Sequence, residues 1–310
     1  MGILVIGDLM LDIYEHVDIT RVSPEAPCLV GLKEKTTYNL GGAANVANNL
    51  QQLTNDCELV GFCDPLRNDI FTTEIQTIGL KHKFLAGEVS TKIRFIDTKS
   101  KSQVFRHDIE TVLDNSYEGD FFELAKLFDQ NSYDVLLLVD YKKGMVRKNN
   151  TKFMKRSGIN IVSSKRTDPS SILPPKKSGS VSLLILNQLE FAQLKEYDGF
   201  DYIVRTEGSK GITVLKHDDL DLTLSGIYHV PAHEVKVFDV TGAGDTVVAM
   251  IAYCLNRYGF SEENLKNACY IANLEASFVV SQHGTATIEH TEKEIDWIWS
   301  NIQVQDQVYN

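Results

Sequence analysis

The sequence has few of the features that assign a protein class directly. Only 5 of its 310 residues are cysteines, and no two of them are spaced as C-x-x-C. An odd number of scattered cysteines argues against a disulfide framework or a cysteine metal site, and it is typical of a reduced, cytoplasmic protein. No apolar run approaches membrane-spanning length, so we expect no membrane partner. The cysteines are Cys28, Cys57, Cys63, Cys254 and Cys269.

Positive charge is also scarce. The chain has 31 Lys and Arg against 42 Asp and Glu, a formal net charge of -11 at pH 7, and it contains no basic tract. It therefore lacks the electrostatic footprint of a nucleic-acid-binding protein. An anionic ligand would have to be met by a few local Arg and Lys residues. A strand is predicted from Ile3 onward, which leaves no place for a signal peptide.

Short apolar segments alternate with helical patterns along most of the chain. This alternation predicts an α/β fold with a doubly wound, mostly parallel sheet flanked by helices, and a ligand site at the carboxyl ends of the strands. We expect residues 1–310 to form one domain. Strands are predicted at 3–6, 59–62, 135–139, 159–162, 183–186, 202–204 and 212–215, and helices at 43–53, 121–128, 151–156, 245–258 and 262–281.

Two segments do not fit this alternation. Residues 13–38 and 88–108, with approximate bounds, are rich in β-formers and turn residues. Within the second segment, residues 91–108 alternate like a two-stranded antiparallel ribbon that turns at 99–102. We expect the two segments to form a small separate β sheet, inserted in the domain, that acts as a lid over the site.

The most informative motif is D-V-T-G-A-G-D-T at Asp239–Thr246, which leads into an apolar stretch. The turn Gly242-Ala243-Gly244 can aim several N–H groups at one point, at a helix N-terminus whose dipole favours negative charge. Asp245 places a carboxylate beside this anion cradle. Phosphoryl transfer to a hydroxyl needs both parts: donors for the phosphoryl charge and an acceptor for the proton. The alternative is a turn in which Asp245 only caps the helix.

A second glycine pair, Gly41-Gly42, also precedes a predicted helix and is followed by Asn45. Glycines allow close approach of a ligand, and the Asn45 amide can donate to and accept from sugar hydroxyls. Asp8 and Asp12 follow the first strand, where a carboxylate can accept hydrogen bonds from vicinal hydroxyls. Helix capping by Asn45 and turn capping by the two aspartates are the alternatives.

Two connections suggest a nucleotide site. The segment T-E-G-S-K-G at Thr206–Gly211 joins two predicted strands and can surround a phosphate, although an ordinary hairpin turn is also consistent with it. Asn187 and Glu190 follow another strand, where a carboxylate can hold Mg²⁺ through water. The alternative there is that Asn187 caps a helix.

Basic residues gather in the predicted lid. Lys92, Arg94 and Arg106 can share one face of its ribbon, and Arg21 lies in the earlier lid segment. Such a group suits a phosphate on the substrate, because Arg binds phosphate with a bidentate fork. The alternative is a solvated face with no ligand.

Taken in order, these motifs resemble the ribokinase-like (PfkB) carbohydrate kinases, and among them the branch of D-glycero-β-D-manno-heptose 7-phosphate kinases. The similarity extends over nearly the whole chain. It is carried by residues 7–12 (G-D-L-M-L-D), 21–27 (R-V-S-P-E-A-P), 41–47 (G-G-A-A-N-V-A), 140–144 (D-Y-K-K-G) and 239–246.

The resemblance implies ATP as the phosphoryl donor, Mg²⁺, and in many relatives a monovalent cation such as K⁺. Asp245 would be the general base for the O1 hydroxyl, and Gly242, Ala243 and Gly244 the anion hole. The substrate residues would be Asp8, Asp12, Arg21, Gly41, Gly42, Asn45, Lys92, Arg94, Arg106 and Asp140. The nucleotide residues would be Lys165, Asn187, Glu190, Thr206, Gly208, Gly211 and Asn273, with Glu190 facing Mg²⁺ through water and Asp239 and Thr241 beside the monovalent cation. The lid would also join two copies into a homodimer.

The chain departs from the branch in two places. Ser163-Ser164-Lys165 stands where the heptose kinases usually have Asp-Pro-Lys, and Leu186 replaces the Pro before N-x-x-E. A carboxylate near the site is therefore missing. Bifunctional relatives carry a nucleotidyl-transferring domain after the kinase, and we expect none before the last residue, Asn310.

The sequence thus predicts ATP-dependent phosphorylation of heptose 7-phosphate at O1, for nucleotide-heptose biosynthesis. One alternative keeps the kinase chemistry and changes the acceptor to another sugar or sugar phosphate. Another is a catalytically weak sugar- or nucleotide-binding regulatory protein, which the Ser163-Ser164 departure motivates.

Overall fold

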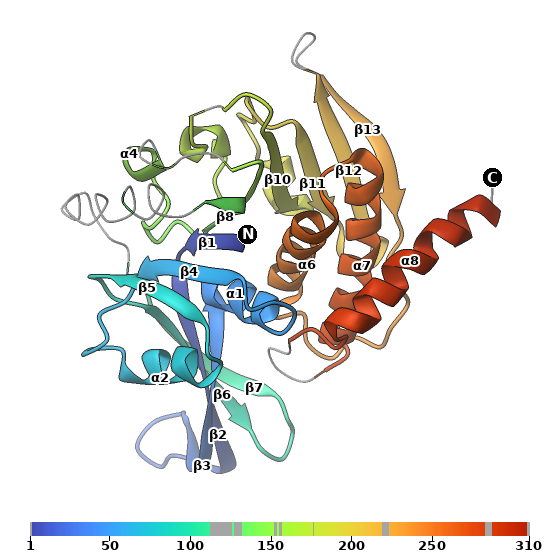
Figure 1. Cartoon of the computed structure of the whole chain (residues 1–310). Helices are drawn as coiled ribbons and strands as arrows, with labels where there is room; N and C mark the ends of the chain where they lie inside the picture. Colours follow the sequence, from blue (N-terminus) through green and yellow to red (C-terminus); the bar gives the residue numbers. More distant parts are fainter. Residues whose placement is uncertain are drawn as a thin grey trace.

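Nine strands form the main sheet of the computed structural model, which describes residues 2–111, 126, 132–151, 154, 157–175, 177–218, 223–282 and 287–308. The strands are β1 (Gly2–Gly7), β4 (Cys57–Phe62), β5 (Lys81–Leu85), β8 (Tyr133–Asp140), β9 (Ile159–Ser164), β10 (Val181–Asn187), β11 (Tyr202–Thr206), β12 (Ile212–Asp218) and β13 (Thr223–Val230). Their order is β13-β12-β11-β10-β9-β8-β1-β4-β5 (Figure 1). All pairs from β11 to β5 are parallel, whereas β11–β12 and β12–β13 are antiparallel. The predicted mostly parallel sheet is confirmed.

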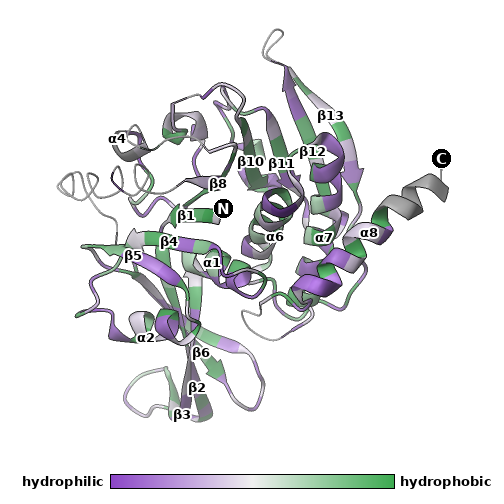
Figure 2. Ribbon diagram, viewed as in Figure 1, coloured by the Kyte–Doolittle hydropathy of each residue, from purple (hydrophilic) through white to green (hydrophobic). Residues whose placement is uncertain are grey.

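Helices cover this sheet because its strands are apolar on both faces. Successive residues of β1 point to opposite sides, so Val5 joins one apolar core with residues of α1, α6 and α7, while Leu4 joins a second core with Leu136 and Phe200. Figure 2 shows the apolar residues concentrated in the central strands. The helices are α1 (Ala43–Gln51), α2 (Asp69–Thr77), α4 (Lys148–Thr151), α5 (Gln188–Ala192), α6 (Ala243–Tyr258), α7 (Glu262–Val280) and α8 (Glu292–Val308), with 3₁₀ turns η2 (Pro169–Ile172) and η3 (Gly208–Lys210).

A second, four-stranded sheet projects from the N-terminal half of the main sheet (Figure 1). We call it the lid sheet; it consists of β2 (Leu9–Val22), β3 (Leu29–Gly42), β6 (Ser90–Asp97) and β7 (Gln103–Ile109), in the order β3-β2-β6-β7. The β6–β7 ribbon is antiparallel and turns between Asp97 and Gln103, close to the predicted turn. The separate sheet was predicted; its movement as a lid stays a prediction.

Some elements differ from the sequence predictions. The elements α2, β5 and α8 were not predicted. The edge strand β5 reads K-H-K-F-L, because an edge strand tolerates charge, and α8 mixes apolar and charged residues. Asp12 lies within β2 and not in a turn after the first strand. Apart from residue 126, the helix predicted at 121–128 lies outside the described residues, as does most of the one predicted at 151–156. In the part of the chain that the structure describes, no helix has the length and hydrophobicity needed to span a bilayer.

Candidate active site

The N-terminus of α6 has the form that the sequence motif predicted. Gly242 is its N-cap residue, with a φ of 87° in the left-handed region that favours glycine. The N–H groups of Gly244 and Asp245 fall in the first helical turn, where no carbonyl of the helix can accept them. A side chain built at Gly244 would meet nothing within 4 Å, so the cradle is open on that side. The free donors and the dipole of a 16-residue helix together favour an anion here.

Asp245 receives one donor on each of its carboxylate oxygens. The Tyr141 hydroxyl donates to Oδ1 at 2.7 Å, and the Asn45 side-chain amide donates to Oδ2 at 2.9 Å. Each oxygen keeps one further lone pair, and the side chain remains partly exposed. Burial raises the pKa of Asp245, and the two donors and the nearby Lys165 ammonium counteract that rise. Gly242, not Asp245, is the cap residue, so the capping alternative for Asp245 does not hold.

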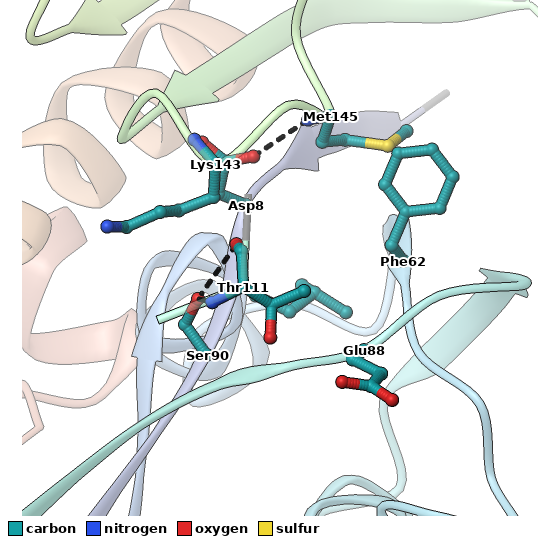
Figure 3. Close-up of a pocket in the computed structure, with 8 residues that line it drawn as sticks. Asp8, Phe62, Glu88, Ser90, Thr111, Lys143 and Met145 are labelled. Atoms are coloured by element: carbon teal, nitrogen blue, oxygen red, sulfur yellow. Dashed lines mark hydrogen bonds between the residues drawn. The ribbon is translucent and has the colours of Figure 1, made fainter. Parts of the chain in front are cut away.

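Tyr141, which was not assigned a role from the sequence, lies in a loop clamped by Asp8. The Asp8 carboxylate accepts the backbone N–H groups of Tyr141, Lys143 and Met145 at 2.8–2.9 Å. Figure 3 shows Asp8 beside Lys143 and Met145. Asp8 is only 3% exposed, and burial raises its pKa against the effect of these three donors. Its two oxygens accept these three loop N–H groups, and the residue also lines the small pocket drawn in Figure 3. The structure therefore places Asp8 where it holds this loop, and its sugar contact stays a prediction.

Asp140 is also engaged within the protein. Its buried carboxylate accepts the Ser164 hydroxyl at 2.7 Å and the Arg166 Nε–H at 2.8 Å, and forms an ion pair with that guanidinium. Ser164 thus completes an internal network at the position where the family usually has Pro. The exposed Lys165 ammonium lies 4.4 Å from the centre of the Tyr141 ring, beside the site.

The lid sheet brings several predicted substrate residues to one face. Asp12 pairs in register with Lys92, and Arg94 with Arg106, so the four side chains share a face by the alternation of the strands. Asp12 and Arg94 form a nearly buried, hydrogen-bonded ion pair. Burial and the neighbouring Arg94 and Lys165 charges lower the pKa of Lys92 against the effect of Asp12.

Arg106 and Arg21, the two remaining basic residues, are less closely associated with the Asp12–Arg94 pair. Arg106 is about half exposed and pairs with Asp108 at 2.9 Å. Arg21 is exposed and lies nine residues from Asp12 along β2, about 30 Å at the rise of a strand. The structure therefore does not bring Arg21 to the other three within one chain.

The glycine pair allows a close approach between the two sheets. Gly42 has a φ of 60°, and a Cβ there would lie 2.4 Å from the Asp8 carbonyl oxygen. A Cβ at Gly41 would lie 2.9 Å from Asp12 Oδ2. The pair is therefore required by packing at the site, whether or not a ligand also approaches it.

The predicted nucleotide residues lie along the far end of the same sheet edge. Thr206, Gly208 and Gly211 form the hairpin turn between β11 and β12. Asn187 and Glu190 form a capping box: each side chain accepts the other residue's N–H at 2.9 Å. Asn273 donates to the Val230 carbonyl at 3.0 Å, which fixes its amide group.

Metal-binding geometry is limited. Asp239 Oδ1 accepts the Thr241 N–H at 2.8 Å, which orders the turn before the cradle. Within the described ranges, no group of three or more His, Cys, Asp or Glu side chains could hold a metal ion. A divalent cation would therefore need oxygens from water and from a ligand.

Comparison with known proteins agrees with this geometry. Residues 186–292 match the model of the pfkB family carbohydrate kinases. The bifunctional protein HldE of Campylobacter jejuni strain RM1221 is 33% identical over 94% of the chain. The chain spans 63% of the length of that relative. The solved structure of phosphofructokinase-2 from Escherichia coli in complex with potassium covers 97% of the chain, and 99% of its own chain is covered, with a TM-score of 0.72 at 14% identity.

Ribokinase from Thermotoga maritima, with a TM-score of 0.65 and 17% identity, covers 97% of the chain and is itself covered completely. These structures share the ribokinase-like fold. Together with the cradle and carboxylate at α6, the comparisons define a sugar kinase. The chain contains a carbohydrate kinase domain of the pfkB family, matched by the family model over residues 186–292.

Proposed function

We propose that the chain transfers the γ-phosphoryl group of ATP to O1 of D-glycero-D-manno-heptose 7-phosphate, giving heptose 1,7-bisphosphate for nucleotide-heptose biosynthesis. The observation that carries the kinase chemistry is the Asp245 carboxylate beside the open N-terminus of α6. The heptose acceptor is supported by the ordered motif resemblance and by the 33% identity to HldE.

In this reaction Asp245 takes the proton of the O1 hydroxyl as the O1–P bond forms and the bond from the γ-phosphorus to the ADP oxygen breaks. The N–H groups of Gly244 and Asp245 stabilise the charge on the phosphoryl oxygens. A fixed carboxylate and fixed amides need no reorganisation at the moment of transfer, and this is how a preformed site lowers the barrier.

The lid sheet supplies the second part of substrate recognition. Lys92 and Arg94 lie on the face of the lid sheet that also carries Asp12. Lys165 is close enough to lower the pKa of Lys92. Burial and the neighbouring Arg94 and Lys165 charges lower the pKa of the half-buried Lys92, and an incoming dianion would stabilise its charged form. We therefore assign the 7-phosphate to this cluster, with Asp12 and the Gly41-Gly42 backbone beside the sugar.

The nucleotide and its metal would lie along the β10–β12 edge, near Glu190, Thr206 and Gly208. One Glu190 oxygen is used in the capping box, and the carboxylate still fits an Mg²⁺ ion that is held mainly by water and phosphates. When bound, Mg²⁺ would neutralise charge on the phosphates. A monovalent cation beside Asp239 and Thr241 stays a prediction.

We also propose a homodimer through the outer face and tip of the lid sheet, and a cytoplasmic reaction. Val22, Leu29 and Leu32 expose 57–66% of their surface at the tip, and Phe105 exposes 61% on the sheet. Exposed apolar groups gathered on one small sheet are typical of an interaction surface. A second copy of the chain is the occupant that the resemblance implies.

The test is ADP release with ATP, Mg²⁺ and K⁺, comparing the aldoheptose 7-phosphate with sedoheptulose 7-phosphate, fructose 6-phosphate and free ribose. We expect turnover with the aldoheptose phosphate alone. Turnover with another acceptor would contradict the heptose assignment and keep the kinase. Folded protein that binds ATP and is inactive with all four would contradict the kinase assignment itself.

A further inference from the structure

We propose that Tyr141 is a positioning residue for the general base: its phenolic O–H, together with the Asn45 amide, fixes the Asp245 carboxylate in the orientation that meets the sugar hydroxyl. The inference rests on the proposed function, in which Asp245 is the base. It assigns a role to the tyrosine of the 140–144 segment and adds a base-orienting contact to the expected sugar contact of Asn45.

The two donors reach Asp245 from different parts of the chain. Tyr141 follows β8 and is 104 positions away, and Asn45 lies in α1, 200 positions away. Each donates to a different carboxylate oxygen, so the plane of the carboxylate is fixed at two points. A base held at both oxygens can present its remaining lone pairs in only a few directions, which is what a bound hydroxyl requires.

The orientation of the Asn45 amide is itself fixed. Asn45 is 1% exposed, and the Asn49 amide donates to its side-chain oxygen at 3.4 Å and to its backbone carbonyl at 2.8 Å. The Asn45 oxygen therefore accepts from Asn49 while its nitrogen donates to Asp245. These bonds fix the amide, and one N–H and one lone pair stay open to a sugar hydroxyl.

The Tyr141 hydroxyl is held equally firmly by its loop. Asp8 accepts the N–H of Tyr141 itself as well as two later N–H groups, as described above. The loop contains Lys142 at a φ of 62° and Gly144 at 110°. A non-glycine residue in the left-handed region is maintained only where the surroundings determine the conformation, and such residues gather at functional sites. The Asp8 clamp is the group that determines it here.

The groups around Asp245 predict how the Tyr141 hydroxyl affects the pKa of this carboxylate. Around Asp245, the Asn45 and Tyr141 donors and the Lys165 charge favour the carboxylate, whereas burial and Asp12 disfavour it. Burial, Asp245, Glu190 and Asp12 raise the pKa of Tyr141 well above its usual range, so this residue stays a phenol that donates. Removing the phenol O–H would therefore raise the pKa of Asp245. Activity needs the ionised base, so its loss at low pH would begin at a higher pH.

The experiment compares Tyr141→Phe with Tyr253→Phe. Tyr253 is a matched control because it lies in α6, the same helix as Asp245, and its buried hydroxyl has no partner in the described structure. We expect Tyr141→Phe to lower kcat about 10- to 100-fold, the rate equivalent of one hydrogen bond to a charged group. KM for ATP should be unchanged, the acid limb of the kcat profile should move to higher pH, and Tyr253→Phe should behave as wild type.

A second substitution should move the acid limb of the kcat profile in the opposite direction. Incorporation of 3-fluorotyrosine at position 141 keeps the shape and makes the phenol a stronger donor, so the acid limb should move to lower pH. A wild-type kcat in Tyr141→Phe would overturn the positioning role. So would a lowered kcat if the acid limb stayed unmoved in Tyr141→Phe and in the 3-fluorotyrosine protein. Wild-type turnover in Asp245→Asn would instead overturn the proposed function, and this outcome distinguishes the two failures.

Discussion

The charged groups at the carboxyl edge of the main sheet have more fixed partners than those on the Asp12 face of the lid sheet. At the main-sheet edge, Asp8, Asp140 and Asp245 each accept donors from fixed positions of the chain. On the lid sheet, the cations Lys92 and Arg94 have fewer fixed partners, and the ion pair to Asp12 is the main one. Preorganised polar groups serve the chemical step, whereas charges with few internal partners serve recognition.

This difference divides the kinetic parameters between the two regions. Substitutions at the main-sheet edge should lower kcat or the stability of the fold, because the groups there support one another. Substitutions on the lid sheet should raise KM for the sugar phosphate and leave ATP binding unchanged. Each prediction below tests one side of this division, and the expected effects decrease in order.

The largest effect is expected for Asp245→Asn. Removing the base should lower kcat roughly 10²- to 10⁴-fold, while the amide keeps the size of the side chain and leaves the α6 cradle in place. Steady-state kinetics and calorimetric titration with ATP measure the two quantities. Near-wild-type turnover would remove Asp245 from the reaction.

Asp8→Asn should destabilise the fold. The asparagine nitrogen would face backbone N–H groups that now donate to a carboxylate, which costs about 2–4 kcal/mol of unfolding free energy. Urea denaturation measures the loss. The control is Asp198→Asn at an exposed position, which should stay within about 0.5 kcal/mol of wild type. Equal stability of the two variants would contradict the clamp.

Arg94→Ala should raise KM for the sugar phosphate about 10- to 100-fold and leave KM for ATP unchanged, because a hydrogen-bonded charged contact to the phosphate is lost. Arg106→Ala should have a smaller effect on the same KM, since Arg106 is half exposed and paired with Asp108. An unchanged KM in Arg94→Ala would exclude this residue from the phosphate site.

The smallest effect is expected for Phe105→Ser on the lid sheet. Loss of an exposed aromatic contact should weaken self-association about tenfold without changing kcat in the dimer. Sedimentation equilibrium measures the dimer dissociation constant. A monomeric wild-type chain at micromolar concentration would contradict the dimer.

The sequence predicted the main sheet well because the apolarity of a strand and the hydrophobic periodicity of a helix are local properties of the sequence. It located the cradle and Asp245 because glycines and a carboxylate at one helix start form a local motif. It did not reveal the contact of Tyr141 with Asp245, which depends on how β8 and α6 meet. The position of Tyr141 directly after a buried strand, at the ligand edge of a parallel sheet, was the available signal.

The same limit applies to the inner carboxylates. Asp140 is a sugar ligand by resemblance, but Ser164 and Arg166 occupy it in the fold. Asn45 has the chemistry of a sugar ligand, which stays a prediction, and in the fold its amide also contacts Asn49 and Asp245. Side-chain type shows which bonds a residue can form, and only packing decides which partner is within reach.

We propose phosphoryl transfer to the anomeric oxygen of a heptose that already carries a phosphate. The decisive measurement is ³¹P NMR of the wild-type chain with ATP, Mg²⁺ and D-glycero-D-manno-heptose 7-phosphate. We expect a new phosphate resonance coupled to the anomeric proton, with the 7-phosphate resonance retained and one ADP formed per product. ADP with inorganic phosphate alone, or a phosphate on another carbon, would contradict it.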